Sequence, residues 1–290
     1  MTLSKMNSGM LPITPSIVQP LVVIKSGLEI FNRELRSSDI KLALSLEETF
    51  QKLAVDWVEL DRGRMMQIFI NIVANGIKFT KSAETRAITI KAYAFEKEPP
   101  DPNEFHIRYL PPKITKHDPT SGPDWGSGNH IFLEFTVQDT GPGLTDEEQK
   151  LLFQRFSQAS RRTHVKYGGS GLGLHICQAL AEMHGGRIGF HSEPGNGSVF
   201  GFYIKCRRAS AESHAVDKDG TSSSETTEDH IRSVLPMRSP KGDVSVDHVS
   251  PSIKTVTFHD STPNGRHKLH VMIVEVIAPI RFLIVFPGSD

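Results

Sequence analysis

Apolar residues recur at helical spacing in three stretches of the chain. The first runs from Ile17 to Leu35, and Pro15 can occupy the opening position of that helix. The second, Arg62 to Thr80, is apolar nearly all round, which indicates a buried helix with Asp61 as its N-cap. The third, Leu172 to Met183, predicts another apolar helix.

Alternating apolar and polar residues predict strands between and after these helices. The last two of these strands flank the turn Glu193 to Ser198, so we expect them to form a hairpin. Thr145 and Glu148 have the spacing of a capping box, which predicts a short helix through Phe153. The predicted strands are residues 40–46, 88–94, 131–137, 187–191 and 198–205.

Two segments have the composition of connections. Residues 96–130 are rich in proline, glycine and charge, and we expect a long excursion between neighbouring strands in which Trp125 serves as a local packing anchor. Residues 207–268 are dominated by Ser, Thr, Asp, His and Pro, which cannot bury enough apolar surface to fold, so we expect a disordered linker.

A polar stripe interrupts the apolar surface of the helix at 62–80. Its four residues follow one another at intervals of four, four and three, which places them on one face. Buried amides without partners cost about 1–3 kcal/mol each, so we expect the stripe to face a ligand, a metal or water. The alternative is that the amides cap an adjacent loop. The stripe consists of Gln67, Asn71, Asn75 and Lys78.

Glycines gather in two clusters, at 141–143 and 168–173. The second runs directly into the helix at 172–183, so backbone amides can face an anion there, which suggests a phosphate cradle. A P-loop is excluded because no Lys follows the glycines, and a dinucleotide loop because the preceding residues 161–167 are polar. Either cluster alone could be a surface loop.

Composition narrows the function classes. Thirty-three basic residues balance thirty-three acidic ones, so nothing in the charge favours a nucleic-acid partner. The two cysteines, Cys177 and Cys206, are too few for a disulfide framework and are expected to be packed thiols. No apolar run approaches the length of a membrane span, and we expect a cytoplasmic protein.

Four motifs in sequence order resemble those of sensor histidine kinases. The stripe helix is similar to the N box, Asp139–Gly143 to the G1 box, Phe153–Phe156 to the F box and Gly169–Leu174 to the G2 box. Fungal hybrid kinases also resemble the chain in the place and composition of segment 96–130. The resemblance implies an α/β fold: a two-layer sandwich of the GHKL type, with a mixed sheet covered by helices on one face and ATP under a mobile lid.

The resemblance also implies site residues and cofactors. Asn75 would ligate Mg²⁺, Asn71 and Lys78 would address the phosphates of ATP, and Asp139 would accept a hydrogen bond from the adenine amino group. Basic residues 161–166 would belong to the lid. The remaining expected ATP-binding residues are Gly141, Gly143, Lys166, Gly169, Ser170, Gly171, Leu172, Gly173 and Leu174.

The same family pattern divides the chain into segments. Residues 1–14 resemble the tail of a dimerisation and phosphoacceptor hairpin, residues 15–206 the ATP-binding domain, and residues 269–290 the truncated start of a receiver domain. None of the thirteen histidines lies in a phosphoacceptor motif, so we expect the hairpin and receiver to act as partners, in a homodimer only when the protein is full length. We expect that the sequence derives from a truncated gene model.

Two other functions stay open. A GHKL-type ATPase of the chaperone or topoisomerase kind would carry a glutamate general base where Asn71 stands. A non-catalytic nucleotide-binding module would need no phosphoacceptor. Intrinsic ATP hydrolysis distinguishes the first, and phosphoryl transfer to a separate hairpin protein distinguishes the second.

Overall fold

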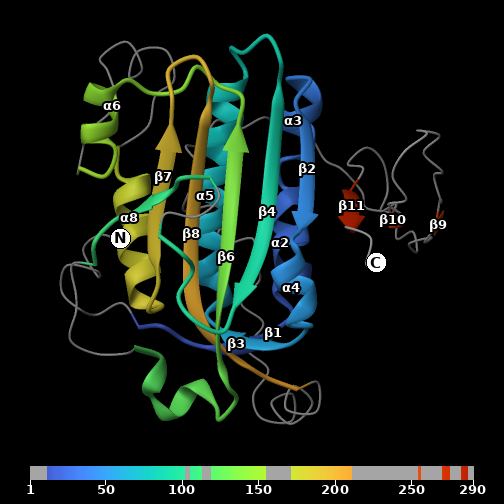
Figure 1. Ribbon diagram of the computed structural model, residues 1–290, viewed down its shortest axis with the longest axis vertical. Helices are drawn as coiled ribbons and strands as arrows, with labels where there is room; N and C mark the ends of the chain where they lie inside the picture. The colour runs from blue at the N-terminus through green and yellow to red at the C-terminus, as the bar shows by residue number, and fades with distance from the viewer. Residues whose placement is uncertain are drawn as a thin grey trace, which may run out of the picture.

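A computed structural model describes residues 12–101, 105–112, 119–154 and 171–210, with the strand segments 254–255, 270–274 and 282–286. The described residues between 12 and 210 form an eight-stranded mixed sheet whose one face is covered by helices (Figure 1). The predicted two-layer α/β sandwich is therefore confirmed. The expected hairpin tail falls mostly on residues 1–11, which lie outside the described residues.

The sheet is mixed because one pair of neighbouring strands is parallel and the others are antiparallel. β2 and β4 run parallel, and β8 pairs with β6 on one side and with β7 and then β3 on the other. The short β5 (Arg108–Tyr109) extends the sheet beyond β7 (Arg187–Ser192). The main order is β1 (Ser16–Val18), β3 (Val58–Leu60), β8 (Ser198–Arg208), β6 (His130–Asp139), β4 (Ala87–Phe95) and β2 (Lys41–Leu46).

The central helix is α5 (Arg62–Thr80), whose bounds match the prediction. Its N-cap is Asp61, whose carboxylate accepts the backbone N–H of Arg64 at 3.0 Å. Its apolar face is buried against the sheet, where the Phe69 ring meets that of Phe135 edge-on at 6.3 Å. Because the apolar face of α5 packs on the sheet, the position of the polar stripe relative to the sheet is fixed.

The other helices are α2 (Pro20–Glu29), α3 (Asn32–Ser37), α4 (Glu48–Lys52), α6 (Asp146–Leu151) and α8 (Gly173–Met183). α8 confirms the expected helix at 172–183 to within one residue. The capping box is also confirmed, since Glu148 N–H donates to the Thr145 hydroxyl at 3.3 Å and the Glu148 carboxylate accepts from Thr145 N–H at 3.0 Å. The helix that it opens ends two residues earlier than predicted.

The prediction of one continuous helix from Pro15 is wrong at the start of that helix and in its middle. Ser16 to Val18 form β1, because their backbone finds partners along Val58 to Leu60 of β3. The helix begins at Pro20, which occupies the first helical position, and it is interrupted after Glu29. α3 then continues the apolar periodicity, so Leu35 still reaches the core.

Segment 96–130 connects the antiparallel neighbours β4 and β6, as predicted, and its described residues 105–112 lie over the face of the sheet that lacks helices (Figure 1). There Ile107 and Tyr109 pack against Phe132 and Tyr203, and the Tyr109 hydroxyl donates to the buried carboxylate of Glu134. Two 3₁₀ turns, η1 (Pro119–Ser121) and η2 (Pro123–Trp125), follow.

Trp125 is a packing residue, as expected, since only 3% of it is exposed. Its ring lies edge-on to that of His184 beyond the end of α8, with centroids 6.4 Å apart. Arg207 secures the neighbouring loop by donating to the carbonyls of Thr120 and Gly128 at 3.3 and 3.1 Å. The described parts of the segment thus contact the domain around Tyr109 and around Trp125.

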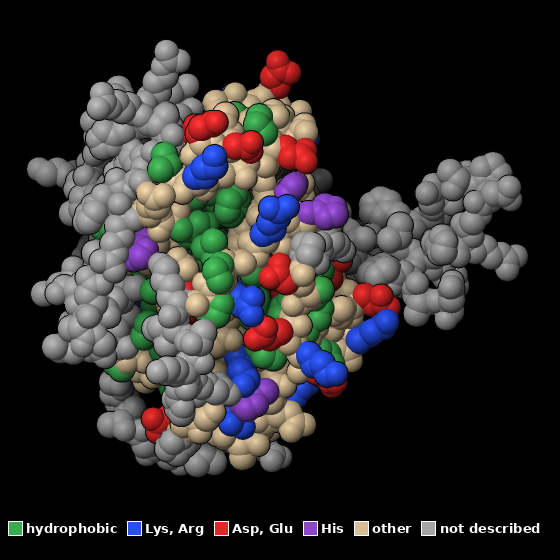
Figure 2. Space-filling model, turned by 60° about the vertical axis from the view of Figure 1, so that its left-hand side comes forward, with side chains coloured by type: hydrophobic (Ala, Val, Ile, Leu, Met, Phe, Trp, Pro, Cys, Tyr) green, Lys and Arg blue, Asp and Glu red, His purple; other side chains and the backbone are tan. Residues whose placement is uncertain are grey.

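The surface in Figure 2 carries Lys, Arg, Asp and Glu side chains interspersed on one face, in keeping with the balanced composition. Within the described ranges, no helix has both the length and the apolar character needed to cross a bilayer.

The C-terminal segments add three antiparallel strands, β9 (Lys254–Thr255), β10 (His270–Val274) and β11 (Phe282–Phe286). β10 coincides with the strand that resembles the start of a receiver. β8 runs to Arg208, whose guanidinium donates to the Leu53 carbonyl at 2.7 Å, so the described domain extends slightly past the expected boundary at 206. Most of the expected linker lies outside the described residues.

Candidate nucleotide-binding site

Asp139 lies at the end of β6, in register with Ile88 of β4 and Ser198 of β8. Only 4% of it is exposed, and its Oδ1 accepts the backbone N–H of Gly141 at 2.8 Å. Burial raises the pKa of this carboxyl to about 6, while backbone N–H groups of Gly141 and Ser198 oppose that rise. Asp139 is therefore a buried acceptor at a strand end, still ionised at neutral pH.

The glycines around Asp139 allow two turns to interlock. Gly143 has φ of +66°, and a Cβ there would lie 2.0 Å from the carbonyl oxygen of Glu193. Gly197 has φ of +83°, and a Cβ there would lie 2.1 Å from the carbonyl oxygen of Asp139. Only glycine fits both positions, so the G1-like turn and the β7–β8 turn hold each other in place.

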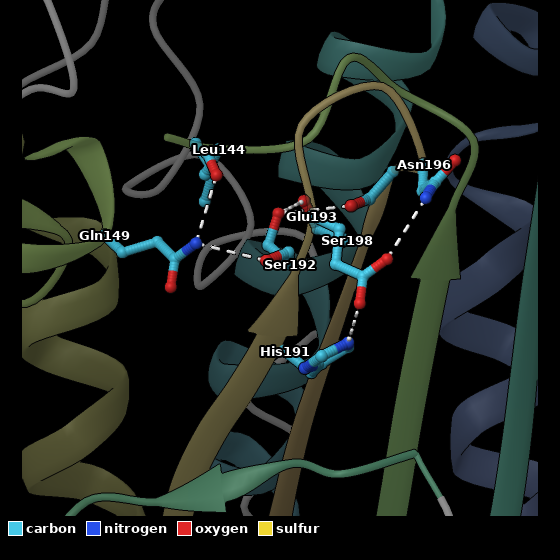
Figure 3. A network of polar contacts seen from close by, with 8 residues as sticks. Leu144, Gln149, His191, Ser192, Glu193, Asn196 and Ser198 are labelled. Carbon is cyan, nitrogen blue, oxygen red and sulfur yellow. Dashed lines mark hydrogen bonds and ion pairs between the residues drawn. The ribbon is translucent and has the colours of Figure 1, made fainter. Parts of the chain in front are cut away.

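Side chains reinforce this junction (Figure 3). Gln149 of α6 donates from Nε2 to the carbonyls of Leu144 at 3.0 Å and Ser192 at 3.1 Å. The Ser192 hydroxyl lies 2.9 Å from that of Ser198. The capped helix, the G1-like turn and the hairpin are thereby joined next to Asp139.

All four residues of the polar stripe are half-buried. Asn71 Nδ2 donates to the carbonyl of Gln67 at 3.0 Å, and Lys78 Nζ lies 5.2 Å from the centre of the Phe79 ring. The described residues offer the Asn75 side chain no hydrogen-bond partner. A half-buried amide in this state is available to a ligand or an ion.

The stripe meets the second glycine cluster where α5 and α8 pack together. A Cβ on Gly173 would lie 3.1 Å from Asn71 Oδ1, so a side chain there would require the asparagine amide to shift by a few tenths of an ångström. Leu172 is the N-cap of α8 and makes no side-chain capping bond, and Gly171 has φ of +67°. The first backbone amides of α8 therefore lie beside Asn71, in the arrangement that anions prefer.

α5 connects the two halves of the site. The Cα of Gly76 faces Asp139, with a hypothetical Cβ 3.7 Å from the Asp139 Cβ, and Asn71 faces Gly173. Five residues separate Gly76 from Asn71, which is about 8 Å along the helix axis. One helix thus lines both the buried acceptor and the amide cluster.

Phe153, the first residue of the F-box-like motif, lies between the two glycine clusters in the sequence. The Phe153 ring packs against Phe190 with centroids 5.9 Å apart, and its carbonyl oxygen lies 3.3 Å from Nδ1 of His175 on α8. Phe153 and α8 are therefore joined. The expected lid and the expected ATP-binding residues Lys166, Gly169 and Ser170 lie outside the described ranges.

The structure brings together two pairs of the described residues that the sequence singled out: Asn71 with Gly173, and Asp139 with Gly141. Ser198 was expected only as the end of a turn, and its place beside Asp139 was not predicted. Ser198 lies opposite Asp139 in the β6–β8 ladder. Its signal was the sequence Gly-Asn-Gly-Ser directly before a strand, since glycine at that point permits close backbone approach.

Comparison with known proteins identifies the family. Residues 60–208 match the family described as "Histidine kinase-, DNA gyrase B-, and HSP90-like ATPase", so the chain belongs to this family of ATP-binding domains. The matched range begins just before α5 and ends with β8, and it therefore contains every element of the site.

Curated relatives carry histidine kinase names. The chain is 28% identical to "Probable histidine kinase 1" of Oryza sativa subsp. indica, over 77% of this chain and 26% of the relative. It is 27% identical to "Peroxide stress-activated histidine kinase mak2" of Schizosaccharomyces pombe, over 72% and 8%. It is 32% identical to "Signal transduction histidine-protein kinase BarA" of Escherichia coli, over 69% and 18%. The chain spans about a quarter or less of the length of these relatives.

Proposed function

We propose that the described domain is the ATP-binding catalytic domain of a hybrid sensor histidine kinase. In this role it presents the γ-phosphoryl group of ATP to a histidine on a separate dimerisation hairpin. Family membership and the names of the relatives support the proposal. The observation that carries it is the single helix α5, which places Asn71 against the first amides of α8 and Gly76 against the buried Asp139.

Asp139 would recognise adenine. A carboxylate that is 4% exposed and has one oxygen engaged by Gly141 offers its remaining acceptor capacity to a donor. Adenine presents an amino group at that edge, whereas guanine presents a carbonyl, so the acceptor discriminates between them. Gly141 and Gly143 keep the turn close to the base.

The phosphates would lie between α5 and the glycine-led helix. The amides of Gly169 to Leu174 supply partial positive charge, and Asn71, Lys78 and Lys166 supply side-chain donors. The start of α8, where Leu172 makes no side-chain capping bond, lies beside Asn71 and supports this placement for the residues that are described.

A magnesium ion fits the donor set. Mg²⁺ takes oxygen ligands and usually keeps one or two protein ligands with phosphate oxygens and water. Asn75 offers one half-buried amide oxygen, and the described residues form no cluster of three His, Cys, Asp or Glu side chains that would hold an ion without nucleotide. When bound, the ion would neutralise charge on the phosphates.

In the proposed role, this domain contributes to the reaction by positioning ATP. An amide such as Asn71 cannot take a proton from water, so the site lacks the glutamate base that the related ATPases would carry at that position. Binding and orientation of ATP then favour transfer to an external histidine over hydrolysis. Substantial hydrolysis by the isolated chain would instead favour the ATPase alternative.

We also propose the wider organisation of the protein. Residues 1–14 continue a dimerisation hairpin, the part of residues 207–268 that follows β8 acts as a linker, and residues 269–290 begin a receiver. The strand β10 supports the last assignment. Homodimerisation, a receiver partner and a cytoplasmic location belong to the same proposal.

A transfer assay tests the proposed function. The chain is mixed with a separate histidine-kinase hairpin protein and γ-labelled Mg-ATP, and acid-labile, base-stable label is measured on both proteins. We expect label on the hairpin alone, and none with the Asn75→Ala variant. Label on the isolated chain, or no transfer with several hairpins despite ATP binding, would contradict the proposal.

A further inference from the structure

One side chain of α6 joins the two turns that flank Asp139. The Nε2 atom of Gln149 donates to the carbonyl oxygen of Leu144 at 3.0 Å and to that of Ser192 at 3.1 Å (Figure 3). An amide nitrogen carries two hydrogens, so these two bonds use its whole capacity as a donor. Leu144 ends the G1-like turn, and Ser192 is the last residue of β7, directly before the β7–β8 turn.

The first of these bonds acts on Asp139 through the G1-like turn. Within that turn, the backbone N–H of Gly141 donates to Asp139 Oδ1 at 2.8 Å, and a Cβ on Gly141 would lie 2.7 Å from the same oxygen. The position of Gly141 therefore decides in which direction the carboxylate points. The turn begins at the end of β6, and the bond from Gln149 to the Leu144 carbonyl holds its other end.

The second bond acts on Asp139 through the β7–β8 turn. The Ser192 hydroxyl donates to the carbonyl oxygen of Gly197 at 3.1 Å, and Gly197 lies so close to Asp139 that a Cβ there would be 2.1 Å from the Asp139 carbonyl oxygen. The two turns also bond directly, since the backbone N–H of Gly195 donates to the Pro142 carbonyl at 2.7 Å. Both hydrogen bonds of the glutamine side chain therefore lead to the same buried carboxyl group.

We propose that Gln149 is a positioning residue for adenine selection: by joining α6 to the two turns, it holds the Asp139 carboxylate in the orientation that receives the adenine amino group. The proposal rests on the function proposed above. The phosphates would lie between α5 and α8, and Gln149 belongs to neither helix. Removing its N–H donors should therefore weaken recognition of the base and leave binding of the phosphates unchanged.

Gln51 provides a matched control. It is also half-buried on a short helix, α4, and its Nε2 donates at 2.8 Å to the carbonyl of Leu46, which lies five residues earlier, as Leu144 does from Gln149. α4 and α6 lie near opposite corners of the sheet (Figure 1). Methionine is flexible, similar in length to glutamine and without an N–H donor, so the same substitution removes the donors at either position.

The test measures the affinities of the wild type, Gln149→Met and Gln51→Met for Mg-ATP and Mg-GTP. Loss of one hydrogen bond corresponds to a change of about fivefold, so we expect Gln149→Met to bind Mg-ATP about fivefold more weakly and Mg-GTP as the wild type does. Its preference for ATP should fall by the same factor, whereas Gln51→Met should keep the wild-type preference even if it loses thermal stability. An equal preference for ATP in the two variants would overturn the proposal, because a merely structural role would lower both affinities alike.

A second measurement needs no nucleotide. Hydrogen exchange of the backbone amides of Gly141 and Gly195, followed by NMR, should be faster in Gln149→Met than in the wild type and Gln51→Met, because these amides make the bonds within and between the two turns. Unchanged exchange would overturn the positioning role, whether or not ATP binds. Faster exchange in a chain that binds no ATP would reject the proposed function and adenine selection together, and would leave Gln149 with a structural role only.

Discussion

Asn71 and Gly173 meet so closely that a methyl group on the glycine would lie 3.1 Å from the amide oxygen of the asparagine. That distance is shorter than an ordinary contact, so one of the two residues would have to move. Helix α5 carries the predicted stripe and helix α8 begins in the predicted phosphate cradle, so the two predicted parts of the site are in close contact at this point.

Gly173→Ala should weaken Mg-ATP binding without lowering the thermal stability of the protein. Alanine is favoured over glycine inside a helix by up to about 1 kcal/mol, so the melting temperature should stay or rise. The methyl group displaces Asn71, so Mg-ATP affinity should fall at least about fivefold, which corresponds to one lost hydrogen bond. Calorimetry and thermal unfolding on one sample measure both effects.

Gly63→Ala is the control for this variant. Gly63 is also a helical glycine, and a Cβ there would have only Asp61 Oδ1 nearby, at an ordinary 3.5 Å. It should tolerate alanine without loss of affinity. If the two alanine variants bound Mg-ATP equally well, Asn71 would not contribute to binding from its present position.

Asn75→Ala should abolish magnesium-dependent ATP binding and leave the fold intact. The amide oxygen of Asn75 is the ligand proposed for the ion, and alanine offers none. Calorimetry with and without Mg²⁺ checks this expectation. Asn32→Ala, a change of a half-buried asparagine on α3, is the matched control. Unchanged Mg-ATP affinity in Asn75→Ala would remove Asn75 from the site.

Asp139 should confer preference for adenine. We expect the wild type to bind ATP at least about tenfold more tightly than GTP, because guanine would leave a buried acceptor unpaired. Asp139→Asn should reduce that ratio, since an amide can present either a donor or an acceptor. Competition with both nucleotides measures the ratio. Equal affinities in the wild type would contradict the assigned role.

The same carboxyl should make stability depend on pH. Its pKa is raised from 3.8 to about 6 by burial, so the folded state disfavours ionisation of this group. The stabilisation is complete below about pH 4 and is lost as the pH rises through about 6. Asp139→Asn should therefore gain up to about 3 kcal/mol relative to the wild type at pH 8.

Urea unfolding at pH 5 and pH 8 measures this difference. The gain of Asp139→Asn should shrink at the lower pH, because the wild-type carboxyl is then largely protonated in the folded state. A gain that is the same at both pH values would mean that Asp139 does not titrate near 6.

The site elements could be predicted largely because their signals are local. α5 is specified by its apolar periodicity and by the N-cap Asp61, and its polar stripe follows from spacing along one helix. The end of β6 and the capping box of α6 depend on neighbours within a few residues, so the sequence carries them directly.

The features that were missed depend on distant partners. Ser16 to Val18 follow a helical pattern but pair with β3, because that pairing satisfies backbone groups some forty residues apart in the chain. Ser198 acquires its place beside Asp139 only through the β6–β8 register. The packing of segment 96–130 on the open face of the sheet likewise depends on Glu134 and Tyr203, which lie later in the chain.

The most direct test of the account is thermal unfolding of the chain with and without Mg-ATP. A ligand that binds only the folded state at a hundred times its dissociation constant stabilises it by about 2.7 kcal/mol. We expect the melting temperature to rise by a few degrees with Mg-ATP, and by much less with Mg-GTP or in the Asn75→Ala variant. An unchanged melting temperature at saturating Mg-ATP would contradict the assignment of an ATP-binding site to α5, α8 and Asp139.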